Sequence, residues 1–421
     1  MQVYKLGKLC KVGSSKRIHL SDYVSEGVPF YRSKEVIELA NKKNISETLF
    51  ISQEKFNEIK QKFPVPCKND ILITSVGTIG IPYLVENENF YFKDGNLTWL
   101  RDFDENLVDI NFIFYFLKSN SFKKQVLNNN IGAVQKALTI DYLRTVNVNL
   151  PIKTVQKKIA SVLSNLDKKI ELNNQINATL EQMAKTLYDY WFVQFDFPDD
   201  NGKPYKSSGG EMVYNETLKR DIPKGWEVKT LNSLGEIVGG STPSTTKAEN
   251  FSLTDGTPWI TPNDLSQNQG NKYIARGETN VTNQGIIDAS LKKYPAGTVL
   301  MSSRAPIGYM AIARKEVTTN QGFKSFIPNK GYDTEFVYYA VLNSMKAITQ
   351  SASGSTFKEI STTVLKGIPV VLPPKERAKT YIEKASEIFS QQNNLEQQNA
   401  ELTKLRDWLL PMLMNGQATV Q

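Results

Sequence analysis

The sequence has very little cysteine and histidine: two cysteines, Cys10 and Cys67, and one histidine, His19, in 421 residues. No CxxC pair is present and His19 has no second ligand near it, so no metal site is expected. We interpret the cysteines as small core or surface residues, and their scarcity is typical of a reducing compartment. A single histidine also leaves little room for a histidine-based catalytic triad.

Long apolar runs are missing as well. The longest, Phe112–Leu117, is far too short to cross a bilayer. Met1–Cys10 lacks the apolar core of a signal peptide. We therefore expect a cytoplasmic protein without a membrane partner. The net charge of +8 is spread over both halves of the chain, and it permits a polyanionic partner without requiring one.

Two chemical signatures are absent. No GxxxxGK[ST] loop is present, so the sequence predicts no P-loop ATPase. No N/D-P-P-Y/F motif, the mark of amino-methyltransferases, occurs either. We expect this chain to bind no cofactor and to be catalytically inert.

What the sequence does contain is a long helical pattern over Lys153–Tyr190, without proline or glycine. At about 1.5 Å per residue such a helix spans on the order of 55 Å and needs a partner of similar length. Its seam residues, seven apart with one polar member, are Ile159, Leu166, Asn173, Leu180 and Leu187. A second seam is expected three positions further on, at Val162, Ile176, Met183 and Tyr190.

The partner lies 222 residues later. Leu150-Pro151 recurs as Leu372-Pro373, and Asn177-Ala178-Thr179-Leu180 recurs as Asn399-Ala400-Glu401-Leu402. The second helix has seam positions at Tyr381, Ile388, Leu395, Leu402 and Leu409, then Leu405 and Met412. Two similar units in one chain mimic a two-fold dimer, so we expect the helices to run antiparallel. Pro411 should close or kink the second helix.

Polar residues interrupt the seam at Asn173, Gln391 and Gln398. They could be buried and set the helix register, or they could face solvent; the sequence leaves both possibilities open. A further set of residues widens the apolar stripe and suggests a second surface for partner helices, namely Leu163, Ile170, Ala184 and Trp191.

Residues 1–150 have a mixed α/β pattern. We expect strands near Val3–Leu9, Val28–Tyr31, Asp70–Ile73 and Pro82–Val85, and helices over Glu47–Lys62 and Asn111–Lys118. After residue 223 the pattern restarts. Thr257–Ile260 corresponds to Val28–Tyr31, Ser302–Gly308 to the glycine loop Thr74–Gly80, and Gly354–Leu372 to Gly132–Leu150.

The predicted organisation is therefore α/β, with two globular domains separated by two long antiparallel coiled-coil helices in an internal pseudo-two-fold repeat. Its parts are a first domain (1–151), a helix (152–195), a polar connector (196–222), a second domain (223–373), a second helix (374–415) and a tail (416–421).

The whole chain resembles the specificity subunit of type I restriction–modification enzymes. The resemblance rests on the repeat, on Leu-Pro before each long helix, on the Gly132 and Gly354 segments, and on the connector with Gly202-Lys203-Pro204 and Ile222-Pro223-Lys224-Gly225-Trp226. It implies two target-recognition domains, each reading one half of a split, asymmetric DNA sequence. It also implies helices that bind two methyltransferase subunits, restriction subunits that join them, and S-adenosylmethionine, ATP and Mg²⁺ bound by those partners.

A target-recognition domain must place polar side chains on base edges and cations on phosphates. In the first domain the candidate DNA-binding residues are Arg32, Lys34, Thr74, Ser75, Thr78, Gln135 and Lys136. In the second they are Asn263, Ser303, Arg304, Asn320, Gln321, Lys324 and Lys358. Each could instead be a solvated loop or cap residue.

Two other functions would also account for parts of this sequence. Pro198-Asp199 followed by Glu227-Val228-Lys229 looks like a PD…ExK metal-nuclease signature. Asp199 falls in the connector, however, and Glu227 is better interpreted as part of the strand that opens the second domain. A coiled-coil adaptor without DNA reading is the other alternative, but a scaffold has no need of two domains with different loops.

Overall fold

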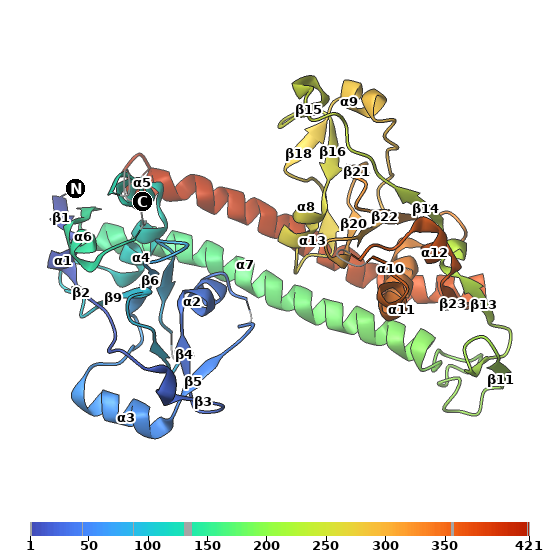
Figure 1. Ribbon diagram of the computed structural model, residues 1–421, viewed down its shortest axis with the longest axis horizontal. Helices are drawn as coiled ribbons and strands as arrows, with labels where there is room; N and C mark the ends of the chain where they lie inside the picture. The colour runs from blue at the N-terminus through green and yellow to red at the C-terminus, as the bar shows by residue number, and fades with distance from the viewer. Residues whose placement is uncertain are drawn as a thin grey trace. The chain divides into compact units, whose positions relative to one another are not determined.

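The computed structural model describes residues 2–43, 45–86, 88–129, 137–354, 358–418 and 420 (Figure 1). The chain divides into two compact units, one of Met1–Ile170 with Glu401–Gln421 and one of Glu171–Ala400. Each unit contains an α/β domain and parts of both long helices, α7 (Lys153–Tyr188) and α13 (Lys375–Met414). The predicted fold class is confirmed. Among the described residues, no helix combines the length and apolar character needed to cross a membrane.

The first domain is built on two four-stranded sheets. One is antiparallel with strand order β2-β9-β6-β7, and the other has order β3-β5-β4-β8, in which β4 and β8 are parallel. The strands are β1 (Gln2–Lys5), β2 (Lys11–Gly13), β3 (Tyr23–Val24), β4 (Val28–Tyr31), β5 (Leu49–Ile51), β6 (Ile71–Thr74), β7 (Pro82–Leu84), β8 (Tyr91–Phe92), β9 (Leu97–Arg101) and β10 (Asn147–Leu150). The helices are α1 (Leu6–Leu9), α2 (Ser33–Ala40), α3 (Gln53–Lys62), α4 (Ile110–Lys118), α5 (Asn120–Asn129) and α6 (Ile140–Thr145).

The second domain has a five-stranded sheet, β14-β22-β19-β20-β17, and a four-stranded one, β15-β18-β16-β21. The connector before it contains β11 (Met212–Asn215) and β12 (Arg220–Pro223). The strands of the second domain are β13 (Glu227–Thr230), β14 (Glu236–Gly239), β15 (Phe251–Ser252), β16 (Thr257–Ile260), β17 (Tyr273–Ile274), β18 (Thr279–Val281), β19 (Val299–Ser303), β20 (Ile307–Ala313), β21 (Thr318–Thr319), β22 (Lys324–Ile327) and β23 (Pro369–Leu372). The helices are α8 (Pro262–Gln267), α9 (Asn283–Asp288), α10 (Thr334–Asn343), α11 (Met345–Gln350) and α12 (Thr362–Gly367).

The internal repeat is visible in the strand pairing. In each domain the first strand pairs antiparallel with the strand just before a long helix, as β1 with β10 and β13 with β23. β4 lies parallel to β8, and β16 lies parallel to β21 in the same way. The strand pairing therefore confirms that one topology is used twice, and it places Glu227 in the opening strand of the second domain.

Two secondary-structure predictions in the first domain were wrong. Glu47–Lys62 is not one helix, because Leu49–Ile51 pairs with β3 and β4 as strand β5. The helix that follows begins only after Ser52, whose side chain accepts a hydrogen bond from the backbone N–H of Lys55 at 3.1 Å. Val3–Leu9 is likewise divided, since the strand stops at Lys5 and Leu6–Leu9 forms a helical turn.

The two long helices run antiparallel within each unit. In the first unit Arg406 donates to Asp167 at 2.8 Å. In the second unit Asn173 donates to Asn399 at 2.9 Å, and Gln392 donates to Glu181 at 3.0 Å. Residue numbers thus rise along α7 while those of its partners fall. Asn173 is fully buried, whereas Gln391 and Gln398 are exposed.

The second seam was expected three positions after the first, but the residues that are buried lie four positions after it. Leu163 and Ala184 are fully buried in the domain cores, as is nearly all of Trp191. The proposal that these residues form a surface for partner helices was therefore wrong. The reason is that each helix packs against its own domain as well as against the other helix. The expected second-row residues Ile176, Met183, Tyr190 and Leu405 are exposed instead, and Val162 and Met412 are half-buried.

The seam residues differ in how deeply they are buried. Ile159 and Leu180 are buried with Asn173 and Tyr381, and the half-buried seam residues are Leu166, Leu187, Ile388, Leu395, Leu402 and Leu409. Pro411 lies inside the last turn of α13, which ends three residues later at Met414. At that end Leu413 and Met414 join the same core as Ile159.

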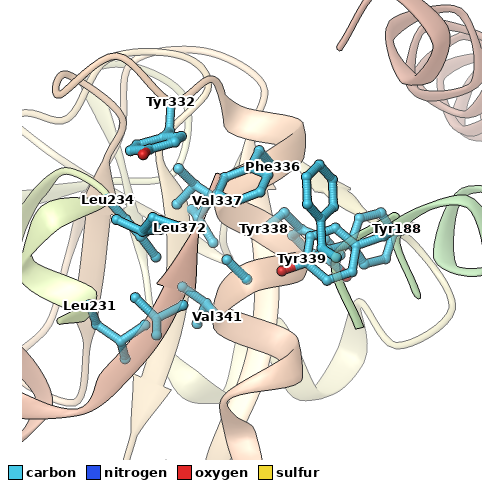
Figure 2. Packing of buried hydrophobic residues seen from close by; sticks show 14 of the residues in the cluster. Tyr188, Leu231, Leu234, Tyr332, Phe336, Val337, Tyr338, Tyr339, Val341 and Leu372 are labelled. Atoms are coloured by element: carbon cyan, nitrogen blue, oxygen red, sulfur yellow. The ribbon is translucent and has the colours of Figure 1, made fainter. Parts of the chain in front are cut away.

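Aromatic side chains dominate the core of the second unit. Tyr188 at the end of α7 lies against α10, with its ring centroid 5.5 Å from that of Tyr339 (Figure 2). The segment expected to be a polar connector also reaches this core, since Phe195 and Phe197 are buried there with Trp226. Folded as a turn and the β11–β12 hairpin, the connector is anchored by aromatic packing.

A buried lysine fixes β17 to the two helices in the second unit. The Lys272 side chain, 2% exposed, lies 2.6 Å from the Glu181 carboxylate and donates to Gln392 at 2.8 Å. Its backbone N–H donates to Glu396 at 2.6 Å. Burial lowers the pKa of Lys272, while Glu181 opposes that shift. Such a cation is tolerated only because its donors are all directed at acceptors.

We predict that Lys272→Met destabilises the second unit strongly. Removing the ammonium leaves the Glu181 carboxylate without its cation; because Glu181 is 37% exposed, we expect the lower end of the cost of breaking a buried ion pair, about 3 kcal/mol. Urea unfolding followed by tryptophan fluorescence would measure the change. The matched control is Lys315→Met, an exposed lysine of the same domain, for which about 0.5 kcal/mol or less is expected. Equal effects of the two substitutions would contradict this account.

Asp167 plays the corresponding part in the first unit. Its carboxylate accepts hydrogen bonds from Tyr115 and Arg406, both at 2.8 Å, and lies 3.7 Å from Lys118. Burial alone would raise the pKa of Asp167, but Lys118, Arg406 and Tyr115 together lower it below its ordinary 3.8. The stabilisation is therefore present above pH 3.8 and is lost as the pH falls further.

We predict that Asp167→Asn lowers the free energy of unfolding at pH 7 by about 1–3 kcal/mol, the value of hydrogen bonds to a charged group. The difference from the wild type should shrink as the pH falls below 3.8, because the carboxyl of the unfolded wild-type chain is protonated first and the native carboxyl follows at lower pH. Denaturant titrations at pH 7 and pH 3 test this. Asp407→Asn, at an exposed carboxylate that also pairs with Arg406, is the control. An undiminished difference at pH 3 would refute the assignment.

Candidate nucleic-acid interface

The glycine loop of the first domain is a hairpin tip between β6 and β7. Thr74 closes it, since its side chain accepts from the backbone N–H of Ile81 at 3.0 Å. The hydroxyl of Ser75 bonds that of Thr98 at 2.7 Å. Both predicted residues are buried and hold the loop in place, whereas Thr78 is exposed at the tip.

Arg32 and Lys34 lie at the start of α2. The Arg32 guanidinium donates to the fully buried Glu35 at 2.6 Å, and this hydrogen bond raises the pKa of Arg32. Arg32 is thus largely engaged within the domain. Lys34 is more than half exposed and lies 3.9 Å from Glu47, so it is the freer cation of the two.

Backbone contacts bring these segments together. The carbonyl of Asn96 accepts from the Ser33 hydroxyl at 3.1 Å and from the Ser75 N–H at 2.8 Å. The carbonyl of Ser75 in turn accepts from the N–H of Leu138 at 2.9 Å. The start of α2, the hairpin and the segment before α6 therefore converge. Gln135 and Lys136 lie outside the described residues.

The second domain repeats this arrangement. The N–H of Ser303 donates to the carbonyl of Gly322 at 2.8 Å, and the carbonyl of Ser303 accepts from Ile360 at 3.1 Å. Ser303 is fully buried, as Ser75 nearly is. The hairpin around Arg304 and the segment before α12 therefore meet at one strand.

The Asn320-Gln321-Gly322 turn lies at the same place. The N–H of Asn320 donates to the carbonyl of Ile260 at 3.1 Å, just before α8, where Asn263 is exposed. A Cβ added to Gly322 would lie 3.0 Å from Pro262 and 3.7 Å from the Arg304 side chain. Gln321 accepts a hydrogen bond from Thr242.

Glu359 is the residue that the sequence prediction missed. Its carboxylate lies 3.6 Å from Arg304 and 3.8 Å from Lys324, two predicted cations. Burial lowers the pKa of Lys324, against the opposing effect of Glu359. The internal repeat could have drawn attention to Glu359, because the residue 222 positions earlier is the uncharged Ala137. Lys358 beside it is exposed.

A hollow of about 420 Å³ opens beside this charge cluster, lined by Lys324, Ser353, Glu359, Ser361 and Thr362. Each of its five lining residues carries a polar side-chain group that could hydrogen-bond a polar ligand. In the described part of the chain, no group of three or more acidic, histidine or cysteine residues could hold a metal ion.

The two acids of the nuclease-like pattern have structural partners. Asp199 accepts from the backbone N–H groups of Asn201 and Lys203, both at 2.8 Å, within the connector turn. Glu227 is paired with Lys229 on β13 at 2.5 Å. The two acids therefore have local partners in different elements, Asp199 in the connector turn and Glu227 on β13.

Comparison with known proteins gives a consistent result. The model of the type I restriction modification DNA specificity domain family matches twice, at residues 1–182 and 223–404. The chain is 38% identical over 208 residues to the type I restriction enzyme MjaIX specificity subunit of Methanocaldococcus jannaschii, covering 48% of this chain and 47% of that protein. It is 29% identical over 403 residues to the HindI specificity subunit of Haemophilus influenzae, covering 83% and 86%.

Among solved structures, the type I restriction–modification S subunit of M. genitalium aligns over 98% of this chain and 95% of its own. Its TM-score is 0.59 at 17% identity, which supports the fold. Because the family model matches both halves of the chain, this protein belongs to the type I restriction–modification DNA specificity family and is a non-catalytic specificity subunit with two target-recognition domains.

Proposed function

We propose that residues 1–151 and 223–373 each read one half of a bipartite, asymmetric DNA target. The observation that carries this proposal is that both domains place three segments around one buried serine, Ser75 or Ser303, through matching backbone hydrogen bonds. The side chains on that shared backbone differ between the domains. Two domains with the same backbone geometry but different side chains are suited to a DNA target whose two halves differ in sequence.

The candidate residues divide into two groups by burial. Exposed polar and basic residues are the ones we propose to meet DNA, namely Lys34, Thr78, Asn263, Gln321 and Lys358, with Arg304 and Asn320 half-exposed beside them. The buried or engaged ones, namely Arg32, Thr74, Ser75, Ser303 and Lys324, support the loops from behind. Loops held by such a second layer keep their geometry when they bind.

We further propose that the long helices bind two methyltransferase subunits. An exposed apolar stripe follows α7 and the turn after it in the second unit, at Leu172, Ile176, Met183 and Tyr190. In the first unit Leu405 and Trp408 are exposed on α13. Met183 and Leu405 are 222 residues apart, so the repeat presents an exposed apolar side chain at equivalent points of both helices. Exposed apolar stripes of this kind bind partner helices.

In this proposal the methyl donor, ATP and Mg²⁺ bind to the methyltransferase and restriction subunits. This chain then contributes the DNA reading and the docking surface, and it works in the cytoplasm beside the DNA.

We predict that Met183→Glu and Leu405→Glu each reduce the number of bound methyltransferase subunits from two to one, and that the double variant binds none. Placing a carboxylate in an apolar helix contact should weaken each site by about tenfold or more. Light scattering of the purified complex gives the stoichiometry. The control is Gln182→Glu, which adds the same charge at an exposed position beside the stripe. Full binding by the double variant would disprove the docking surface.

The second prediction concerns the target. Cells carrying this chain with its methyltransferase should gain a split methylated motif that is absent from cells lacking the chain. Replacing residues 1–151 by the corresponding domain of another specificity subunit should change one half of that motif and leave the other intact. If no new methylation appears with a partner shown to be active, the chain is better described as an adaptor.

A further inference from the structure

The two domains carry different residue pairs at one structurally equivalent point. Val76 follows Ser75 and Arg304 follows Ser303, at the same place in the two hairpins. Val76 forms an antiparallel bridge with Ala137, and Arg304 forms one with Glu359. The same bridge therefore presents an all-carbon pair in the first domain and an Arg–Glu pair in the second.

The Arg–Glu pair is only half engaged. The Arg304 nitrogen lies 3.6 Å from the Glu359 carboxylate, and the two side chains are 38% and 40% exposed. A strong charge-assisted hydrogen bond between such groups is about 2.7–2.9 Å long. The guanidinium, with five donors in a fixed fork, thus keeps donors for an outside ligand.

Glu359 is held in place from its other side. The Ser303 hydroxyl donates to it at 3.5 Å, and the Lys324 ammonium lies 3.8 Å away with only 14% of its side chain exposed. At the equivalent positions the first domain has Ser75 and Thr98, hydroxyls that bond each other at 2.7 Å. The charged set is therefore particular to the second domain, and it positions an acceptor next to a donor fork.

That arrangement suits a G·C pair better than an A·T pair, because only guanine places two acceptors side by side for a guanidinium fork. In the major groove guanine offers two acceptors, O6 and N7, and its partner cytosine offers the N4 donor. An adenine would place its N6 donor against the guanidinium. A phosphate would be repelled by the carboxylate, which argues against a backbone contact at this point.

We propose that Arg304 and Glu359 together read one G·C base pair in the half-site of the second domain. Arg304 donates to guanine O6 and N7, and Glu359 accepts from cytosine N4. At the equivalent point the first domain presents only carbon and reads no G·C pair. This inference rests on the proposed DNA-reading function.

The test uses the double variant Arg304→Val with Glu359→Ala, which gives the second domain the pair that the first domain already accommodates. Half-exposed ion pairs contribute at most about 1 kcal/mol to stability, so the variant should fold. The full chain with its methyltransferase subunits is assayed for methylation of a duplex library randomised over the second half-site. Circular dichroism and complex stoichiometry check that the variant is intact.

We expect the wild type to require G·C at one fixed position of that half-site. The double variant should accept other pairs there, with discrimination falling by about tenfold to a hundredfold, since a bidentate base contact is worth about 1–3 kcal/mol. All other positions, including the first half-site, should keep their preference. Lys358→Ala, which removes a neighbouring charge, should weaken binding to every sequence alike and lower the salt slope by about one.

An unchanged motif, a relaxed position that is not G·C, or a uniform loss of affinity without relaxed specificity in the double variant would each overturn the inference. These outcomes differ from a failure of the proposed function. If the proposed function itself is wrong, the wild-type chain directs no sequence-dependent methylation, which is seen before any variant is compared.

Discussion

The structure depends on burial of the two long helices. Helices of 36 and 40 residues with mostly polar surfaces gain their stability from packing rather than from intrinsic propensity. Each buries one row of side chains against the other helix and a second row against an α/β core, as Leu163 and Ala184 do in the two units. The domains and the helices therefore stabilise each other, and neither is an independent layer.

Polar contacts decide how the helices fit together. A purely apolar seam tolerates a shift by one turn, but Asn173 is fully buried and bonds Asn399. A shifted register would remove the partner of the buried Asn173 side-chain N–H, at about 1–3 kcal/mol. Lys272 extends this principle to the second domain, because its buried ammonium and backbone N–H both bind helix residues. The second domain is thus held to both long helices by directional bonds.

Directional hydrogen bonds also hold the loops in place. Ser75 and Ser303 make equivalent backbone hydrogen bonds on both sides of their strands, and these bonds do not depend on the neighbouring side chains. The residue after the serine is valine in one domain and arginine in the other, while the backbone hydrogen bonds of the serine are the same. This separation of backbone frame from side-chain chemistry lets one topology present two different surfaces.

The sequence by itself determined the repeat, the two long helices, their antiparallel pairing and the family. These follow from local periodicity and from the 222-residue offset, which chain packing does not alter. Only the tertiary structure decided which residues face outward. Thr74 and Ser75 have the composition of a reading loop but are buried behind it, and Leu163 and Trp191 are covered by domain cores rather than exposed. Glu359 is 55 residues from Arg304 in the sequence, and only strand pairing brings them together. Exposure and long-range pairing depend on contacts between distant segments, which no local pattern encodes.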